Sequence, residues 1–525
     1  MRDLLHSLNY EAWALPALLL IPLVGAVITR FLGRPVSAQP GEPGFDWREA
    51  HVLTLATLTL EAVVAAGLWF VFDPAEAGWQ VVTDAAWIPD WGARFTLGVD
   101  GISLFMVLLT VFVVPLSVLG SWTQVRERAN SYYALLLALT TGIIGVFVAL
   151  DLLLFYIFWE LMLVPMYFII GIWGGERRVY ASLKYFIYTM LGSLLMLVAI
   201  LSLWIAAGSS SFSYDHLLAN VGLSPTAQLW MFGAFFLAFA VKSPLFPFHT
   251  WLPDAQHEAP TTGAVALGIK VATYGIIRFA VPFFPAAATH PTVTTVILSL
   301  SVISIVYGAL VAMVQPDFKR LVSYSSISHL GFIMLGIFAL NVQSVQGALM
   351  VMLSAGITTT ALFLLLGMLH ERRKTGMIHN FGGIARVVPM FSAFLVLAAL
   401  SSIGLPGTSG FVGEFLVLLG AYRNYPLYTF VAATGVIFAA IYFLWALQRL
   451  LFNPITIENV RSLPDLNRRE LGVMTVLGLA LLVLGIAPGP ILRRIEPSAQ
   501  RFVETVQQGA EAIEREAVGA EPVAP

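Results

Sequence analysis

The chain of 525 residues contains no cysteine, so it can neither form a disulfide nor bind an iron–sulfur cluster through thiolates. Charged residues are also scarce, at 11% of the chain, whereas soluble domains carry about 25%. The net charge of −2 gives no reason to expect binding to nucleic acid. The sequence lacks a Walker loop, a GxGxxG motif after a strand, and an HExxH or His-rich metal motif. We therefore expect this chain to carry no cofactor and no metal ion of its own.

Hydrophobic residues make up 58% of the chain, and its mean hydropathy is +0.84. This composition predicts an all-α, polytopic membrane protein. The first apolar run, from Trp13 to Leu32, lacks the basic segment and cleavage site of a signal peptide, so we expect a retained helix. A span needs about 20 mostly apolar residues, and that rule predicts about 14 transmembrane helices. They lie near residues 13–32, 52–73, 101–121, 132–150, 152–173, 181–207, 227–250, 260–284, 291–313, 320–340, 345–369, 388–421, 427–452 and 471–491.

Lysine and arginine are distributed unequally between the connections that alternate along this helix order. The even-numbered connections hold only Arg94 and Arg423. The odd-numbered connections hold Arg30, Arg34, Arg48, Arg126, Arg128, Arg177, Arg178, Lys184, Lys319, Arg320, Arg372, Arg373, Lys374, Arg386, Arg449, Arg461, Arg468 and Arg469. Because basic loops stay on the cytoplasmic side, both termini are predicted to lie outside. We expect a multi-pass membrane protein.

Two further segments lie outside the predicted spans. In residues 74–100, two β-prone runs flank the turn residues Pro89-Asp90-Trp91-Gly92, which predicts a small outside hairpin with a structural role. After Ile491 the chain carries several arginines among glutamates, and we expect a short surface helix there.

Two predicted spans contain strong helix breakers. The seventh contains Lys242-Ser243-Pro244-Leu245-Phe246-Pro247, and the twelfth contains the stretch 401–410 with Pro406 and three glycines. Proline removes a backbone donor and clashes with the preceding turn, so both helices are expected to be broken. Because the breaks lie five helices apart, they fit two inverted five-helix repeats, helices four to eight against nine to thirteen. We therefore divide the chain into N-terminal helices with the hairpin (1–130), a proton-translocating core (131–453), and the last helix with the tail (454–525).

Among the 28 Lys and Arg residues, Lys242, Lys270 and Arg278 lie well inside predicted helices, and the other 25 can be placed in loops, helix ends or tails. A cation at the centre of a membrane helix costs about 2.5–3.5 kcal/mol on insertion scales, so such residues usually face a hydrated interior. In an apolar setting lysine can release its proton, whereas arginine stays charged. Lys270 is therefore the expected central proton carrier, with a static buried ion pair as the alternative. Arg278, about two turns later, is expected to be a structural or snorkelling cation.

Three more ionisable residues lie in apolar helices. Glu160, in the fifth helix, would take up a proton if unpaired. Lys242 is its natural partner, and such a pair would suit a switch, with a static ion pair as the alternative. His329 follows four serines in 323–328 whose hydroxyls can order water, and imidazole titrates near neutral pH, which favours a relay over a structural histidine. Glu414, beyond the second break, could exchange the proton in the other half. These residues predict one proton path: Glu160, Lys242, Lys270, His329 and Glu414.

A polar cluster follows the first break, and one carboxylate is left without an assigned role. The cluster comprises His249, Asp254, His257 and Glu258. We interpret it as the mouth of a proton path or a structural loop rather than as a metal site. Glu61, in the second helix, lies outside the predicted repeats and is unexplained.

These strings resemble the antiporter-like membrane subunits of respiratory complex I, the proton-translocating NADH–quinone oxidoreductase, and within that family the subunit M (chain 4) branch. The branch is indicated by the Trp159–Tyr167 string and by Glu414, where sister subunits are expected to carry lysine. The matching segments cover essentially the whole chain: Phe158–Tyr167, Val241–Pro244, Trp251–Ala255, Ala259–Thr261, Lys270 with Tyr274–Phe279, Asp317–Leu321, His329–Phe332 and Gly410–Phe415.

The resemblance implies specific roles and partners. Glu160 and Lys242 match the family's ion pair, Lys270 its central lysine, His329 a bridging histidine, and Glu414 the terminal proton site. It further implies that NADH, FMN, iron–sulfur clusters and quinone are bound by partner subunits, and that this chain contacts neighbouring antiporter-like subunits and the lipid bilayer. One departure is Ala355, which stands where family members often have a histidine. The relay would there need water with Ser354, Thr358 or Thr359.

Three other functions fit parts of the same pattern. One is a subunit of a multi-chain cation/proton antiporter, in which an ion gradient drives transport without redox chemistry. Another is a subunit of a membrane-bound hydrogenase with nickel–iron partners. A purely structural membrane scaffold is the third, and the buried ionisable residues argue against it.

Overall fold

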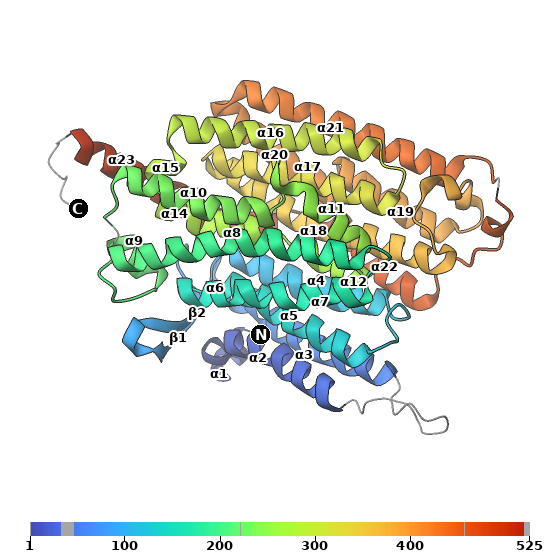
Figure 1. Cartoon of the computed structure of the whole chain (residues 1–525), viewed down its shortest axis with the longest axis horizontal. Helices are drawn as coiled ribbons and strands as arrows, with labels where there is room; N and C mark the ends of the chain where they lie inside the picture. Colours follow the sequence, from blue (N-terminus) through green and yellow to red (C-terminus); the bar gives the residue numbers. More distant parts are fainter. Residues whose placement is uncertain (1, 33–46, 221, 456, 519–525) are drawn as a thin grey trace.

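The computed structural model describes residues 2–32, 47–220, 222–455 and 457–518. Among these residues, 12 helices are long and apolar enough to cross a membrane, which confirms an all-α polytopic protein. They run side by side along the long direction of the molecule (Figure 1). They are α2 (Tyr10–Leu32), α3 (Trp47–Val71), α4 (Ser103–Gly120), α5 (Ala129–Val148), α6 with α7 (Leu152–Leu161 and Leu163–Trp173), α8 (Arg178–Ala206), the segment Thr261–Phe283, α16 (Pro291–Met313), α17 (Phe318–Phe338), α18 (Val342–Arg373), the segment Pro426–Phe452 that begins with α21 (Pro426–Leu447), and α22 (Arg468–Ile486).

Both predicted helix breaks are present. Helix α10 (Pro225–Lys242) ends at Lys242, and the chain resumes as α11 (Trp251–Glu258). Helices α19 (Pro389–Ile403) and α20 (Ser409–Asn424) are separated by a non-helical stretch at 404–408. These are the predicted seventh and twelfth spans, and neither is one of the 12 spans given above. The count of about 14 and the inverted repeats therefore stay predictions.

The predicted continuous helix at 260–284 is wrong at one point. Helix α12 (Thr261–Leu267) stops before Gly268, and α13 (Val271–Gly275) starts after Lys270, whose φ of −85° and ψ of 55° are not helical. A π-helical turn, η3 (Ile276–Ala280), and α14 (Val281–Phe283) complete the span. The sequence offers no proline at this break, so only Gly268 could have signalled it. The central lysine therefore sits in a break of its own.

The predicted hairpin is confirmed. Strands β1 (Gln80–Ile88) and β2 (Ala93–Val99) pair antiparallel around the turn Pro89–Trp91. The predicted C-terminal surface helix is also present, although at 30 residues α23 (Gly489–Val518) is longer than expected. It packs against α18 and α15 (Pro285–Ala288). The hairpin, α9 (Tyr214–Asn220) and α23 lie at the same end of the molecule (Figure 1).

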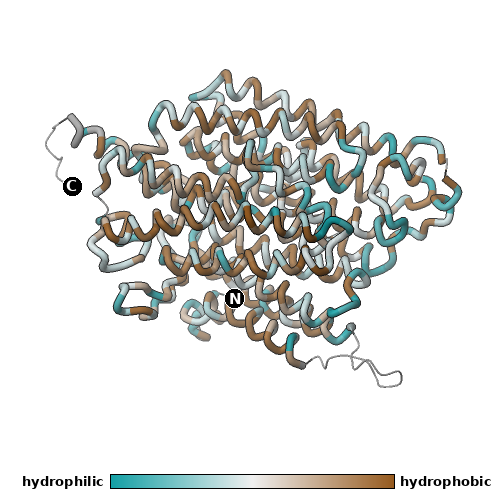
Figure 2. The backbone as a smooth tube through the Cα atoms, in the orientation of Figure 1, coloured by the Kyte–Doolittle hydropathy of each residue, from teal (hydrophilic) through white to brown (hydrophobic). Residues whose placement is uncertain are grey.

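The opposite end of the bundle carries the α4–α5 and α7–α8 connections, which contain Arg126, Arg128 and Arg177. We call it the basic end, and the other the hairpin end, where the short α1 (Arg2–Ser7) also lies. Hydrophobic residues follow the helices, and hydrophilic ones gather in the turns at the basic end (Figure 2). Large apolar side chains such as Phe31 and Trp230 are about four-fifths exposed, as expected for lipid-facing positions.

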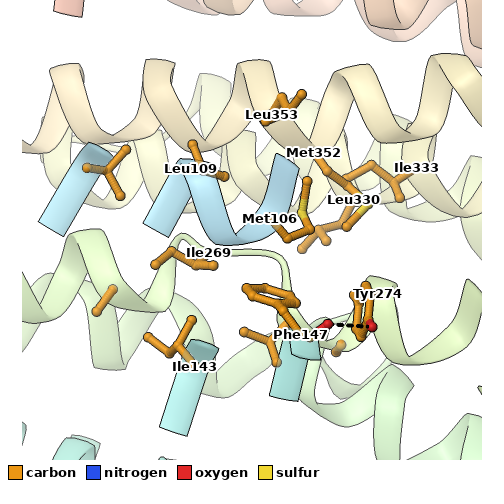
Figure 3. Packing of buried hydrophobic residues seen from close by; sticks show 14 of the residues in the cluster. Met106, Leu109, Ile143, Phe147, Ile269, Tyr274, Leu330, Ile333, Met352 and Leu353 are labelled. Atoms are coloured by element: carbon orange, nitrogen blue, oxygen red, sulfur yellow. Dashed lines mark hydrogen bonds between the residues drawn. The ribbon is translucent and has the colours of Figure 1, made fainter. Parts of the chain in front are cut away.

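A continuous core of buried side chains joins the helices that surround the break at Lys270. Figure 3 shows Phe147 of α5, Ile269 and Tyr274 of the broken span, Leu330 of α17 and Leu353 of α18 close together. The Tyr274 hydroxyl donates a hydrogen bond to the Phe147 carbonyl at 2.8 Å. This packing fixes the broken span between both halves of the bundle.

Candidate functional site

Glu160 and Lys242 come from α6 and α10, next to the ends of both helices. The Lys242 ammonium donates a hydrogen bond to the Tyr185 hydroxyl of α8 at 2.9 Å. The Glu160 charge acts on both Lys242 and Tyr185, but no direct ion pair joins Glu160 to Lys242 among the described residues. One Glu160 oxygen is buried without a hydrogen-bond partner there. The charges of Glu160 and Lys242 therefore interact although no direct ion pair joins the two side chains.

A cavity connects Lys242 with Lys270. Its volume is about 40 Å³, and its lining includes Tyr185, Ile269 and Leu330. Since one water needs roughly 10–15 Å³ of such space, the cavity has room for about three. Lys270 is only 5% exposed. Water in this cavity would link the two lysines and reach α17 beside His329.

Helix α18 lies between two of the breaks. On one face, the methyl group of Thr359 lies next to Gly268, where an added Cβ would be 3.4 Å away. One residue earlier, the Thr358 hydroxyl lies 3.2 Å from the hydroxyl of Ser401, which is 3.1 Å from that of Ser409. Helix α18 therefore contacts the Lys270 break through the Thr359 methyl group and the α19–α20 break through the Thr358 hydroxyl.

His329 and Glu414 form the second half of the site. His329 Nδ1 lies 2.9 Å from Glu414 Oε1, and its Nε2 lies 3.1 Å from the Ser402 hydroxyl. Both side chains are buried. Glu414 also abuts the break itself, because a Cβ on Gly404 would lie 2.9 Å from Glu414 Oε2. The φ of Gly404 is +80°, so glycine is required there both for backbone conformation and for space.

Arg278 is held by groups at the hairpin end. Its guanidinium forms an ion pair of 2.6 Å with Asp100, and its side chain is 7% exposed. Its Nε donates to the Tyr274 hydroxyl at 3.1 Å. The structural interpretation therefore fits, because Asp100 supplies a charge partner from the segment before α4, and the snorkelling alternative stays a prediction. A sequence search could not have paired residues so distant.

The residues of the polar cluster after the first break have different partners. Asp254 pairs with Lys184 at 2.8 Å and with Arg320 at 3.4 Å, and His257 lies 3.3 Å from Asp317. His249 is separate from these groups. It is 3% exposed, both of its ring nitrogens lack a partner among the described residues, and it stacks on Phe246.

Sequence reasoning missed two contributors to the site. Tyr185 and Ser402 contact Lys242 and His329 directly, but a tyrosine and a serine in apolar helices carry no distinctive pattern.

The chain is similar to known proteins over most of its length. Residues 149–441 match the family described as NADH:quinone oxidoreductase/Mrp antiporter, TM. NADH-quinone oxidoreductase subunit M of Rhodobacter capsulatus is 41% identical over 92% of this chain and 95% of its own length. NADH-ubiquinone oxidoreductase chain 4 of Arabidopsis thaliana is 36% identical over 93% and 97%.

A solved structure is similar over nearly the whole length. One chain of respiratory complex I from Thermus thermophilus with bound NADH superimposes with a TM-score of 0.85 and 32% identity, covering 94% of this chain and 99% of that one. The chain therefore belongs to the NADH:quinone oxidoreductase/Mrp antiporter membrane family, in the group of subunit M (chain 4).

Proposed function

We propose that this chain is a proton-translocating membrane subunit of an NADH–quinone oxidoreductase. NADH oxidation and quinone reduction take place in partner subunits that bind FMN, the iron–sulfur clusters and the two substrates. This chain lies in the membrane beside other antiporter-like subunits. It binds no redox group and supplies the proton path, in agreement with the absence of cysteine.

The observation that carries this proposal is the buried series of ionisable and hydroxyl groups across the bundle. It begins at Glu160 and Lys242, continues through the cavity to Lys270, and ends at His329 and Glu414. Each ionisable group lies in or beside a helix break or interruption, where freed backbone groups can hold water. A static scaffold would gain nothing from so many buried charges, because each is costly in a membrane.

In the mechanism we propose, the charges of Glu160 and Lys242 set the proton affinity of Lys270. When the Lys242 ammonium stays near Glu160, its field on Lys270 is partly cancelled, and Lys270 holds a proton. When a signal from the partner subunits separates the pair, the uncancelled Lys242 charge repels the Lys270 proton. That proton passes through water and the α18 hydroxyls to His329 and then to Glu414. At 100 mV each transferred charge costs about 2.3 kcal/mol, which the redox reaction must supply.

We further propose the arrangement of the chain in its membrane. Residues 131–453 form the translocating core, with residues 1–130 and 454–525 as flanking regions. The basic end faces the cytoplasm of a bacterial cell, which leaves both termini outside. The asymmetry of arginine and lysine between the two ends supports this orientation.

The test is purification from membranes in mild detergent, followed by identification of the accompanying chains. Recovery with flavin- and iron–sulfur-containing subunits and with NADH–quinone activity supports the proposal. Recovery with membrane subunits alone, and cation-dependent proton exchange in vesicles, would instead establish a cation/proton antiporter. Nickel–iron partners would indicate a hydrogenase.

The role of Lys270 is tested in the same assembly reconstituted into vesicles. Lys270→Met should assemble but lose proton pumping, and Lys270→Arg should behave similarly because arginine does not release its proton. Lys374→Met is the control, because Lys374 is exposed in the loop after α18. Full pumping by both Lys270 variants would contradict the proposed path.

A further inference from the structure

The buried face of α3 carries polar groups that the proton path does not use. Its buried residues include His51, Thr54 and Glu61, all with 0% exposure. Both carboxyl oxygens of Glu61 and the hydroxyl of Thr54 lack a hydrogen-bond partner among the described residues. At 1.5 Å per residue, Glu61 lies about 10 Å from Thr54 and about 15 Å from His51 along the helix. We call these residues the polar column; it runs from the basic end to the middle of α3, with the buried Leu58 between Thr54 and Glu61.

Glu61 has no cationic partner on the helices packed against α3, which are α2, α4 and α5, with smaller contributions from α1 and from α23, whose Arg494 lies over the Trp69 ring, eight residues beyond Glu61. Helix α4 carries no ionisable residue, and α5 carries only Tyr132 and Tyr133. Helix α2 carries Tyr10 and Glu11 at one end and Arg30 at the other, and Arg30 is exposed. The ionisable residues of α1 are exposed at the hairpin end: Arg2, Asp3 and His6. An ionised Glu61 would therefore be uncompensated in an apolar interior, which strongly favours the neutral acid.

The backbone of α2 offers an acceptor for that acid. Gly25 packs against Thr57, and the Tyr10 hydroxyl donates to the Val64 carbonyl, which together set the alignment of α2 with α3. This alignment puts Leu18 at about the height of Glu61. Pro22 lies four residues after Leu18 inside α2, so the Leu18 carbonyl receives no helical hydrogen bond. A protonated carboxyl can donate there, whereas a carboxylate cannot.

Further unpartnered polar groups lie between Glu61 and the basic end. The same alignment puts Thr29 of α2, whose buried hydroxyl also lacks a partner among the described residues, at about the height of Thr54. Two unpartnered hydroxyls at one height are groups that buried water would satisfy. Beyond Glu61, towards the hairpin end, the buried face continues with Ala65 and Leu68, both apolar and 0% exposed.

His51 and Tyr133 close the column at the basic end. His51 Nδ1 lies 2.9 Å from the Trp47 carbonyl, which can only accept, so Nδ1 carries the hydrogen. In the neutral ring, Nε2 then accepts the hydrogen bond from the Tyr133 hydroxyl. Nε2 can take a proton when that hydroxyl turns away, and the rings of Trp47 and Trp122 pack around the imidazole. The pair is suited to gate proton exchange.

We propose that Glu61 is a proton-binding site separate from the path through Lys270. Glu61 is protonated at rest. It exchanges its proton with the basic end along a route past Thr54 and the His51–Tyr133 pair. On release, the carboxyl O–H bond breaks, the carboxylate keeps the electron pair, and a water molecule hydrogen-bonded to the carboxyl takes the proton and passes it on to water at Thr54. Uptake is the reverse. Because the column is closed beyond Glu61, the site loads and unloads from one side and moves no net charge across the membrane.

The test is infrared spectroscopy of the intact, purified assembly at neutral pH. Wild type should show the C=O stretching band of a protonated carboxylic acid that is absent in Glu61→Gln. Glu61→Asp should shift that band instead of removing it. If Glu61→Gln fails to assemble, this shift still assigns the band to residue 61. Glu49→Gln, an exposed position on the same helix, should leave the band unchanged.

Access is measured by exchange into deuterated water, which should shift the Glu61 band in the wild type. In Tyr133→Phe, which keeps the ring but removes the hydroxyl, exchange should be slower by about tenfold or more. A missing band would mean that Glu61 is ionised and would overturn the site. A band that never exchanges, or that exchanges equally fast in Tyr133→Phe, would overturn the route. None of these readouts depends on proton pumping.

Discussion

His329 Nδ1 lies 2.9 Å from Glu414 Oε1, and the pair joins α17 to α20 directly beside the α19–α20 break. A histidine with one nitrogen on a carboxylate and the other on the Ser402 hydroxyl can take a proton on one side and release it on the other. The pair thus brings together two of the five residues that the sequence predicts in one path.

We predict that Glu414→Gln will assemble normally but reduce proton translocation per NADH by roughly tenfold, which corresponds to about 1.4 kcal/mol in the barrier. The amide preserves the shape and a hydrogen bond to His329, but it cannot carry the proton. The measurement is proton uptake by reconstituted vesicles against NADH oxidation. Glu504→Gln, exposed on α23, is the control, and pumping equal to wild type in Glu414→Gln would exclude Glu414 as a carrier.

The turn at Gly404 should be needed for the position of the Glu414 carboxylate. Gly404 and Gly407 both have positive φ, +80° and +90°, but only at Gly404 would a Cβ meet Glu414, at 2.9 Å. Alanine strains the backbone by roughly 1 kcal/mol at either position. Gly404→Ala should therefore lose pumping in an assembled complex, whereas Gly407→Ala should lose only a little stability. Equal loss in both variants would mean that strain, not displacement of Glu414, is the cause.

Much of the fold was predictable because its signals are local. Runs of apolar residues gave the spans, proline and glycine gave the breaks after Lys242 and at Gly404, and turn residues gave the hairpin. The break at Lys270 was missed because no proline marks it. Its non-helical backbone is maintained by packing such as that of Gly268 against Thr359, which depends on residues far away in sequence.

The site was predictable in its residues and not in its contacts. Buried charges are rare enough in membrane helices that Glu160, Lys242 and Lys270 stand out from composition alone. Which groups touch depends on helix packing, and Tyr185 rather than Glu160 accepts the hydrogen bond of Lys242. For the same reason the sequence left Arg278 without its partner Asp100, which lies in the segment before α4.

The buried Asp100–Arg278 pair should matter for stability. Asp100→Asn leaves the oxygen that caps the amides of Ile102 and Ser103 but removes the charge opposite Arg278. An unpaired buried charge costs about 3–5 kcal/mol, so unfolding in detergent should shift to lower temperature. The double variant Asp100→Asn/Arg278→Gln should recover most of the loss.

The exposed pair Asp84–Arg94, with side chains 42% and 44% exposed, provides the comparison. Asp84→Asn should cost about 1 kcal/mol or less, because water screens that pair. If Asp100→Asn costs no more than Asp84→Asn, the buried pair does not stabilise the fold.

Asp317, which lies at the basic end, should make the thermal stability of the protein depend on pH. It caps α17 by accepting from the Arg320 amide at 3.0 Å, and it lies 3.3 Å from His257 Nδ1. Burial alone would raise the pKa of this carboxyl, but the hydrogen bond and charge of His257, with the Arg320 amide and the Lys319 charge, hold the pKa below its ordinary value of 3.8. Since the folded pKa is the lower one, the stabilisation is complete above the ordinary value and is lost as pH falls through the folded pKa.

Wild type should therefore lose thermal stability more steeply than Asp317→Asn as pH is lowered below about 4. The two proteins should differ most near neutral pH and converge in acid, because the protonated aspartate and the asparagine are then equally uncharged. Asp90→Asn, exposed in the hairpin turn, should follow the wild-type curve throughout. Parallel curves for wild type and Asp317→Asn would mean that the carboxylate is no more stable in the folded state than in the unfolded one. The contact with His257 would then be a consequence of packing and not a source of stability.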